Sequence, residues 1–386
     1  MIFSRRHGLL TSFEVLKKYG VYFLSQSNTS FNLCVAVDHP GLYLYVPLIS
    51  YYLHTDVMTG ALIFFALLSM MLFSSYILLL WQLTRTSAIF YIGLLWTAYT
   101  AYKIYLTNDV YVVVAWALFP LSFLLIALHK KSKTWWLIGS FFVGLVTLPA
   151  HIVRFYSCVP LLFFFFWMLL FIPFLTKKYK LISLLFFLGG FFGPFAHYRY
   201  VVHKKNTFLE EQHCNISKNQ PYSFWHSIYI GFGFLRNLYK IRYADQCAFD
   251  AARSVNPTTF TGHQDYDSIV ASLVYKLFKQ DCHFFMISLF AKAGVVLMFF
   301  LVWWGWLGVL CSYWYPKPWY EEIAWWGLFA LAAAPGILAI PRFEYLSGFI
   351  VGTVFYVLYS TLRACNHGMI AWLWSSMKKA YKGVVS

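Results

Sequence analysis

Five ionisable side chains stand at or near the ends of apolar segments, and their types are suited to joint chemistry: Asp38, Lys103, Asp109, Arg154 and Arg342. A positioned carboxylate can take the proton of an attacking hydroxyl. Lysine and arginine bind phosphate, and fixed positive charge stabilises the charge that develops on a leaving phosphate. If the fold brings these residues together, they predict transfer of a group from a lipid-phosphate-linked sugar to an acceptor hydroxyl.

Other polar residues lie beside these positions or in the long polar segment of the chain. The candidates for substrate binding are His39, Tyr43, His151, His226, Glu344 and Tyr345. No Cys/His or His/Asp spacing of a known metal site is present in the sequence, so we predict no metal site.

Each of the main candidates also has a structural interpretation. Lys103 can extend to the outer headgroups without binding substrate. Asp109 can act only as a helix N-cap. Arg154 and Arg342 can bind ordinary phospholipid headgroups or pair with Glu344, and His151 can be a packed polar histidine.

The elements that must position these residues are strongly apolar. Of 386 residues, 60% are hydrophobic, 22% are aromatic and only 11% are charged, with a mean hydropathy of +0.62. A soluble domain carries roughly 25% charged residues. The composition excludes a soluble enzyme and predicts an all-α integral membrane protein. The net charge of +16 does not indicate nucleic-acid binding, because the basic residues are dispersed between apolar blocks.

Apolar segments long enough to cross a bilayer, at about 20 residues each, recur along the chain. They are 59–81, 88–106, 110–128, 134–150, 157–175, 181–197, 284–311, 322–340 and 345–362. Residues 20–37 are polar for a span, and whether they form a further helix stays open. We therefore expect about 9–10 transmembrane helices.

Basic residues in short loops mark the cytoplasmic side. One set of loops holds Arg85, Lys130, Lys131, Lys133, Lys177, Lys178, Lys180, Lys317, Arg363, Lys378, Lys379 and Lys382, whereas the short loops of the opposite side hold only Arg154 and Arg342. This orientation places the candidate residues and the hydrophilic segment 198–283 outside the cytoplasm. We predict a membrane module with a first outer loop and an interfacial helix (1–197), an outer cap (198–283), and C-terminal helices with a cytoplasmic tail (284–386).

Four short stretches resemble the GT-C superfamily of polytopic glycosyltransferases, especially bacterial aminoarabinose transferases and protein O-mannosyltransferases. They are Asp38–Tyr43 followed by Pro47, Thr107–Tyr111, Leu148–Arg154 and Ile340–Tyr345. The first two are similar to outer loops in which an acid precedes a helix, although His39 stands where the first loop often has a second acid. The loop Phe224–Asp245 also resembles outer loops of GT-C-like proteins.

This resemblance implies an inverting glycosyltransferase that acts outside the cytoplasm. The donor would be a polyprenyl-phosphate-linked hexose or pentose, and the acceptor a lipid, glycan or protein of the cell envelope. By position, Asp38 would be the catalytic base and Asp109 a second acid near acceptor or donor. Lys103, Arg154 and Arg342 would contact the lipid phosphate. A divalent ion between the two acids is left open, but no cofactor is predicted.

The same resemblance suggests a bacterial inner membrane with a periplasm-facing site, or a lumen-facing site in the endoplasmic reticulum of a eukaryote. The rival hypothesis is a polytopic transporter or lipid flippase, which predicts charges through the membrane depth and often inverted repeats. In the sequence the charges concentrate near one face, no repeat is evident, and Lys292 is the main exception. A non-catalytic scaffold subunit is a third hypothesis.

Overall fold

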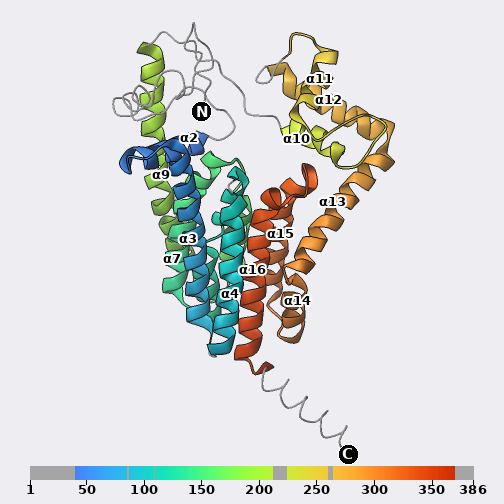
Figure 1. The fold of residues 1–386 in the computed structure, drawn as a ribbon. Coiled ribbons are helices and arrows are strands. Elements are labelled where there is room, and N and C mark those ends of the chain that lie inside the picture. The colour runs from blue at the N-terminus through green and yellow to red at the C-terminus, as the bar shows by residue number, and fades with distance from the viewer. Residues whose placement is uncertain (1–39, 85–86, 108, 212–223, 260–263, 370–386) are drawn as a thin grey trace, which may run out of the picture.

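A computed structural model describes residues 40–84, 87–107, 109–211, 224–259 and 264–369 of the chain, and within these ranges the only regular secondary structure is helical. The helices are α2 (Pro40–Tyr52), α3 (Val57–Leu83), α4 (Ser87–Thr107), η1 (Val110–Val112), α5 (Val113–Trp116), α6 (Leu121–Lys130), α7 (Lys133–Val153), α8 (Val159–Phe171), α9 (Lys177–Glu211), α10 (Phe224–Gly231), η2 (Phe232–Phe234), α11 (Asp245–Val255), α12 (Gln264–Gln280), α13 (Cys282–Val302), α14 (Gly305–Trp314), α15 (Trp319–Leu338) and α16 (Phe343–Asn366). Figure 1 shows a bundle of long helices with α10, α11 and α12 gathered beyond one end.

In the described part of the chain, six helical stretches are long and apolar enough to cross a membrane: Met58–Leu83, Val110–Lys130, Lys133–Val153, Lys177–Tyr200, Cys282–Val302 and Phe343–Asn366. Each coincides with a predicted span, as does the shorter apolar helix α8. The helices α4 and α15 also coincide with predicted spans and have 21 and 20 residues. They are less apolar, α4 because of its tyrosines and Lys103 and α15 mainly because of Glu321 and Glu322. The chain therefore has the helices of a multi-pass membrane protein, and the total of 9–10 spans stays a prediction.

Two predicted segment boundaries differ from the structure. The expected span 284–311 is two helices, because α13 ends at Val302 and Trp304 takes a left-handed conformation (φ 65°) before α14 begins. The expected start of the outer cap at residue 198 falls inside α9, which continues to Glu211. No proline or glycine interrupts 198–211, so nothing in the sequence stops the helix at the membrane boundary.

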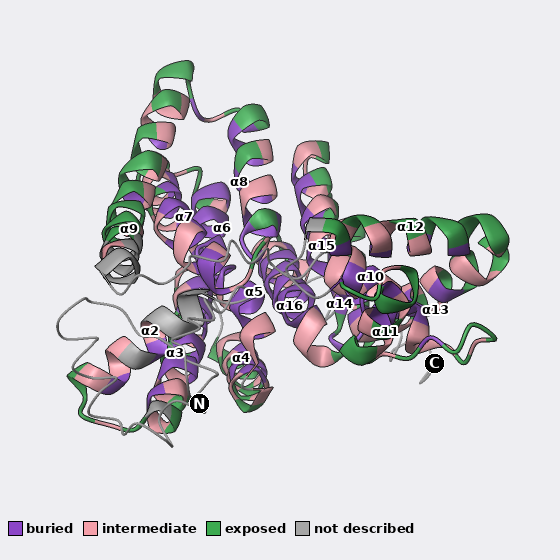
Figure 2. Ribbon diagram, turned by 90° about the horizontal axis from the view of Figure 1, so that it is seen from above, coloured by how far each residue is buried: buried purple, intermediate pink, exposed green. Residues whose placement is uncertain are grey.

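The centre of the bundle is α16. Almost every side chain from Leu346 to Leu362 on this helix is buried, and its neighbours include the fully buried Trp325 of α15 and Tyr76 of α3. Seen from above, α16 lies at the middle of the bundle, whereas α9 and α12 are largely exposed (Figure 2). The exposed side of α9 is apolar within Lys177–Tyr200, as expected for a surface that faces lipid.

Glycines allow α7 and α9 to pack closely. A Cβ atom at Gly144 of α7 would lie 2.0 Å from the carbonyl oxygen of Phe187, and one at Gly190 of α9 would lie 2.1 Å from that of Phe141. Small residues let helix backbones approach in membranes, where apolar side chains gain little by leaving lipid. This contact anchors the otherwise exposed α9 to the bundle.

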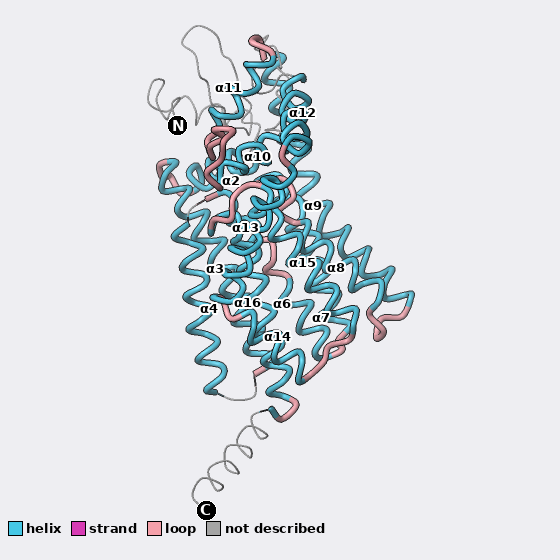
Figure 3. Tube along the Cα trace, turned by 90° about the vertical axis from the view of Figure 1, so that its right-hand side faces the viewer, coloured by secondary structure: helices cyan, strands magenta, loops and turns pink. Residues whose placement is uncertain are grey.

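The two ends of the bundle differ in the residues that they carry. One end, here called the outer face, carries Asp109, Arg154 and Arg342 together with α10, α11 and α12, which we call the cap. The inner face carries Lys131, Lys177 and Arg363. Figure 3 shows the cap beyond the outer end of the bundle. Which compartment each face meets stays a prediction.

The cap is fixed to the bundle through α13 and α15. Gly231, at the end of α10, lies so close to α15 that a Cβ there would stand 2.6 Å from the carbonyl oxygens of Leu338 and Ala339. The Lys292 ammonium of α13 donates to the Leu338 carbonyl at 3.3 Å. Lys292 therefore meets the outer end of α15 beneath the cap. Its place in the sequence suggested the membrane midplane, because α13 was expected to start level with the other spans.

Candidate functional site

The predicted catalytic Asp38 and its neighbour His39 lie outside the residues that the structure describes. Tyr43 belongs to α2, but its side chain is also outside the description. The remaining candidates can be placed. Those in the loops before η1, after α7 and before α16 come together, and Tyr345 of α16 joins them. Lys103, His151 and His226 do not.

Asp109 opens η1 at the outer face. Its carboxylate accepts a hydrogen bond from the backbone N–H of Tyr111 at 3.0 Å, which is the N-cap geometry that its position allows. Burial raises the pKa of the Asp109 carboxyl, the Tyr111 bond and Arg154 lower it, and the charge of Glu344 raises it. A carboxyl with a raised pKa is suited to proton transfer near neutral pH. Asp109 can therefore take part in proton transfer as well as serve as the N-cap of η1.

Arg154 binds the ring and hydroxyl of Tyr111. The Arg154 Nη2 donates to the Tyr111 hydroxyl at 2.6 Å, and the guanidinium carbon lies 4.1 Å from the centre of the same ring. Tyr156 also hydrogen-bonds the guanidinium. Arg154 is half-buried, and a planar guanidinium held in this way presents its remaining donors in a fixed direction.

Tyrosines connect Arg154 to the second arginine. The rings of Tyr111 and Tyr345 lie 4.0 Å apart, and the hydroxyls of Tyr345 and Tyr243 are 2.5 Å apart. We call Tyr111, Tyr243 and Tyr345 the outer tyrosine cluster. The Arg342 guanidinium stands 5.3 Å from the centre of the Tyr243 ring. The cluster therefore links η1, the loop before α11 and the start of α16 between two arginines.

Two further candidates, Lys103 and His151, precede Asp109 and Arg154 by a few residues but do not contact them in the described structure. The ammonium of Lys103 lies 5.6 Å from the ring of Tyr99, one turn earlier on α4, and within the described ranges no contact joins it to Asp109, Arg154 or Arg342. Helical side chains lean toward the N-terminus of their helix, which on α4 is the inner face. His151 packs its ring 4.8 Å from that of Phe155.

His226 lies inside the cap. Its ring nitrogens meet the Tyr266 hydroxyl at 2.6 Å and the Asp245 carboxylate at 3.1 Å, and the side chain is buried. Both partners belong to the cap, so these contacts support a packing role that joins α10 to α11 and α12.

Glu344 is in the first turn of α16, where the helix dipole stabilises a negatively charged side chain. No group of three or more His, Cys, Asp or Glu side chains suited to a metal occurs among the residues whose placement is described. The arrangement offers one carboxyl with a raised pKa, two arginines and a set of aromatic hydroxyls, which is chemistry for holding an anion beside a proton acceptor.

Sequence reasoning named Tyr345 but missed the other tyrosines that connect these groups. Tyr111 follows Asp109 by two positions, and Tyr156 follows Arg154 by two positions, so their proximity to the candidates was a usable signal. Tyr243 carried no such signal, because it is separated from Tyr345 by 102 residues.

Comparison with known proteins finds no matching family model, no matching curated protein and no matching solved structure. The function must therefore be argued from the residues themselves.

Proposed function

We propose that the chain is a membrane glycosyltransferase that moves a sugar from a polyprenyl-phosphate donor to an acceptor hydroxyl at the outer face. The observation that supports this proposal is the juxtaposition of Asp109 with Arg154, joined through the outer tyrosine cluster to Arg342. The GT-C resemblance of the stretches around these residues is a second, weaker support.

The groups have distinct roles in the proposed reaction. The acceptor oxygen forms a bond to the anomeric carbon, and the bond from that carbon to the phosphate oxygen breaks, with its electron pair leaving on the polyprenyl phosphate. The acceptor proton passes to a carboxylate, which the resemblance assigns to Asp38, with Asp109 as the second acid. Attack opposite the leaving group inverts the anomeric configuration.

The arginines suit the leaving phosphate. Arg154 keeps N–H donors in a fixed plane, because Tyr111 holds the guanidinium by a hydrogen bond and by its ring. Arg342 is exposed and stacks on Tyr243, so it can meet a headgroup that approaches from lipid or water. Preorganised cations of this kind stabilise the charge that develops in the transition state. Lys103 is not needed in this arrangement.

The proposal is tested first by binding. The full-length protein in detergent micelles is titrated with polyprenyl monophosphate, with polyprenyl alcohol as the uncharged comparison. Loss of one charge-assisted contact costs about 1.5–3 kcal/mol, so we expect Arg154→Gln and Arg342→Gln each to weaken phosphate binding by at least about tenfold. The control is Arg253→Gln, since Arg253 is an exposed arginine of the cap outside the outer tyrosine cluster.

Transfer is then measured with radiolabelled polyprenyl-phosphate hexose and pentose donors and a detergent extract of membranes as the acceptor source. We expect label transfer by the parent protein and none by Asp38→Asn. Equal binding of phosphate and alcohol, or full transfer by Asp38→Asn, would contradict the proposal. Translocation of a fluorescent phospholipid in proteoliposomes without any transfer would favour the flippase hypothesis instead.

A further inference from the structure

A cavity of about 690 Å³ opens at the inner face, opposite the site discussed above. Its walls come from the end of α6, the loop between α8 and α9, the start of α15 and the end of α16. The volume lies in the range of roughly 300–1,000 Å³ that is usual for small-molecule sites. Its apolar side includes Leu128 and Ile172, and its polar side carries His129, Lys131, Glu321, Arg363 and His367.

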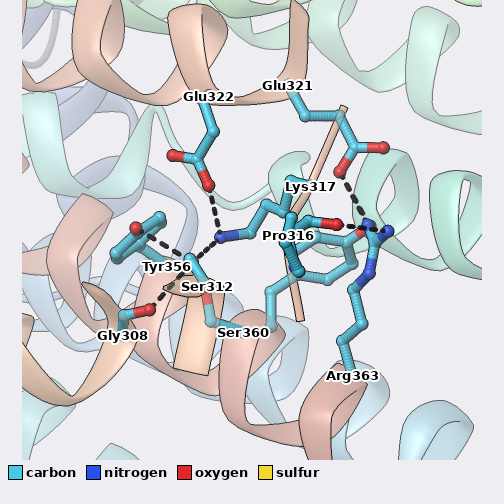
Figure 4. Close-up of polar contacts among 10 residues, drawn as sticks. Gly308, Ser312, Pro316, Lys317, Glu321, Glu322, Tyr356, Ser360 and Arg363 are labelled. Atoms are coloured by element: carbon cyan, nitrogen blue, oxygen red, sulfur yellow. Dashed lines mark hydrogen bonds and ion pairs between the residues drawn. The ribbon is translucent and has the colours of Figure 1, made fainter. Parts of the chain in front are cut away.

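The carboxylate in this lining is already balanced. The Arg363 Nη1 lies 3.1 Å from the Glu321 carboxylate, and the Tyr359 hydroxyl donates to the same oxygen at 3.4 Å. Figure 4 shows the Arg363 guanidinium between Glu321 and the carbonyl oxygen of Pro316, which accepts from Nη2 at 3.4 Å. The guanidinium plane is therefore fixed, and its five N–H donors exceed these two bonds.

A second ion pair, Lys317 with Glu322, lies nearby and adds no net charge to the cavity. The buried ammonium of Lys317 lies 3.2 Å from the Glu322 carboxylate, contacts the Ser312 hydroxyl and stands 4.2 Å from the centre of the Tyr356 ring (Figure 4). Neither Lys317 nor Glu322 lines the cavity. Among the described residues, formal charge in the lining therefore comes from Lys131 and Arg363 against Glu321, which leaves a net +1 with neutral imidazoles.

The uncompensated cation is Lys131. No acidic side chain pairs with it anywhere in the part of the chain that the structure describes. Its backbone adopts the left-handed conformation (φ 50°, ψ 38°) at the end of α6, which is uncommon and costly for a residue with a side chain. The helix C-terminus explains a cation at this position. It does not explain why a lysine, rather than glycine or asparagine, holds the left-handed position at the rim of a cavity.

We infer that this cavity, the inner pocket, binds a phosphate-bearing anion. Arg363 supplies a fixed fork of donors and Lys131 supplies the unbalanced charge, while His129 and His367 belong to the same lining. The apolar wall suits the hydrocarbon part of a phosphate ester. The same chemistry is offered by an anionic lipid headgroup of the inner leaflet and by a soluble phosphate ester. This site is independent of the proposed transfer, because its residues belong to the opposite face.

Two probes separate the two sources. Glycerol 3-phosphate is titrated into the full-length protein by calorimetry, with glycerol as the comparison. Phosphatidylglycerol is counted on the protein by native mass spectrometry, with phosphatidylcholine as the comparison. We expect Lys131→Asn to weaken binding of whichever phosphate probe binds by about tenfold, a loss of 1.4 kcal/mol. Asparagine tolerates the left-handed conformation, so the fold should be retained.

Lys131→Gly is the second variant, because glycine fits the same conformation and lacks the charge. The matched control is Lys178→Gln, an exposed lysine of the inner face that does not line the cavity. Loss of binding in both Lys131 variants, with the control unchanged, supports the inner pocket, and the responding probe identifies the source. Absence of binding by both probes, or equal binding by all variants, would overturn the inference.

Discussion

Asp109 has a structural role and a proposed chemical role, and one substitution separates them. Asparagine caps a helix about as well as aspartate, because its side-chain oxygen can accept the same bond from the Tyr111 N–H. It carries no charge and cannot take a proton. Asp109→Asn therefore keeps the geometry of η1 and removes the carboxylate, whereas Asp109→Ala removes both.

The expected magnitudes follow from the contacts. The N-cap of η1 is a single hydrogen bond of 3.0 Å from the Tyr111 N–H to the Asp109 carboxylate. Asp109→Ala should therefore lose about 1 kcal/mol of stability. Asp109→Asn should lose none at neutral pH, because burial and Glu344 both disfavour the ionised carboxyl. A positioned proton-transfer group contributes about 10²–10⁴-fold to rate, so label transfer by Asp109→Asn should fall by at least about 100-fold.

The pH dependence gives an independent check. Because the pKa of folded Asp109 lies above its ordinary value of 3.8, the folded state holds this proton more tightly than the unfolded state does. The associated stability is fully present below pH 3.8 and is lost as the pH rises through the raised pKa. The melting temperature of the parent protein should therefore fall relative to that of Asp109→Asn as the pH rises across that window. Transfer should instead rise over the same window, as the carboxylate forms.

The reasoning is refuted if Asp109→Asn transfers sugar at the parental rate while Asp109→Ala loses stability. That result would leave Asp109 with the capping role alone. An Asn variant that is inactive and also melts well below the parent would contradict the claim that the two roles separate.

Two predictions concern packing, and both are measured by unfolding of the purified protein. Gly190→Ala should destabilise the protein by about 1–3 kcal/mol, because its Cβ would lie 2.1 Å from the Phe141 carbonyl oxygen. The control is the adjacent Gly189→Ala, whose Cβ meets open space, so this change should be neutral or stabilising. Equal effects of the two substitutions would contradict the close α7–α9 contact. Tyr266→Phe should cost the cap about 1–3 kcal/mol, because it leaves the buried His226 ring without its 2.6 Å partner, and unchanged hydrogen exchange in α10 would contradict this.

The helices could be predicted from the sequence because each apolar run is close to the length that a bilayer span needs. The predicted spans fall on helices, and six of them remain long and apolar in the structure. The break at Trp304 was missed because neither Trp303 nor Trp304 is a helix breaker, and the residue type of Trp304 does not favour the left-handed conformation that it takes. The extension of α9 was missed because a change in hydropathy marks the membrane boundary, not the end of a helix.

The candidate site was predictable only in part, for a different reason. Position after an apolar run identifies charged residues at one face, and this brought Asp109, Arg154 and Arg342 into consideration. It does not give the direction of a side chain, so Lys103 was included although its ammonium leans back toward Tyr99. Tertiary contacts between distant segments, such as Tyr243 with Tyr345, leave no periodic signal in a single sequence.

The tyrosines help to hold the two arginines of the outer face. Like charges repel, and a carboxylate placed between them would neutralise the pair and compete with any anionic ligand. Aromatic rings attract cations through their faces while adding no formal charge. Tyr111 and Tyr243 each take one arginine, and Tyr345 joins the two rings. At the inner face the opposite solution is used, because Glu321 neutralises Arg363 directly. The outer face thus holds its arginines with aromatic rings that add no negative charge, which suits the proposed binding of a lipid phosphate.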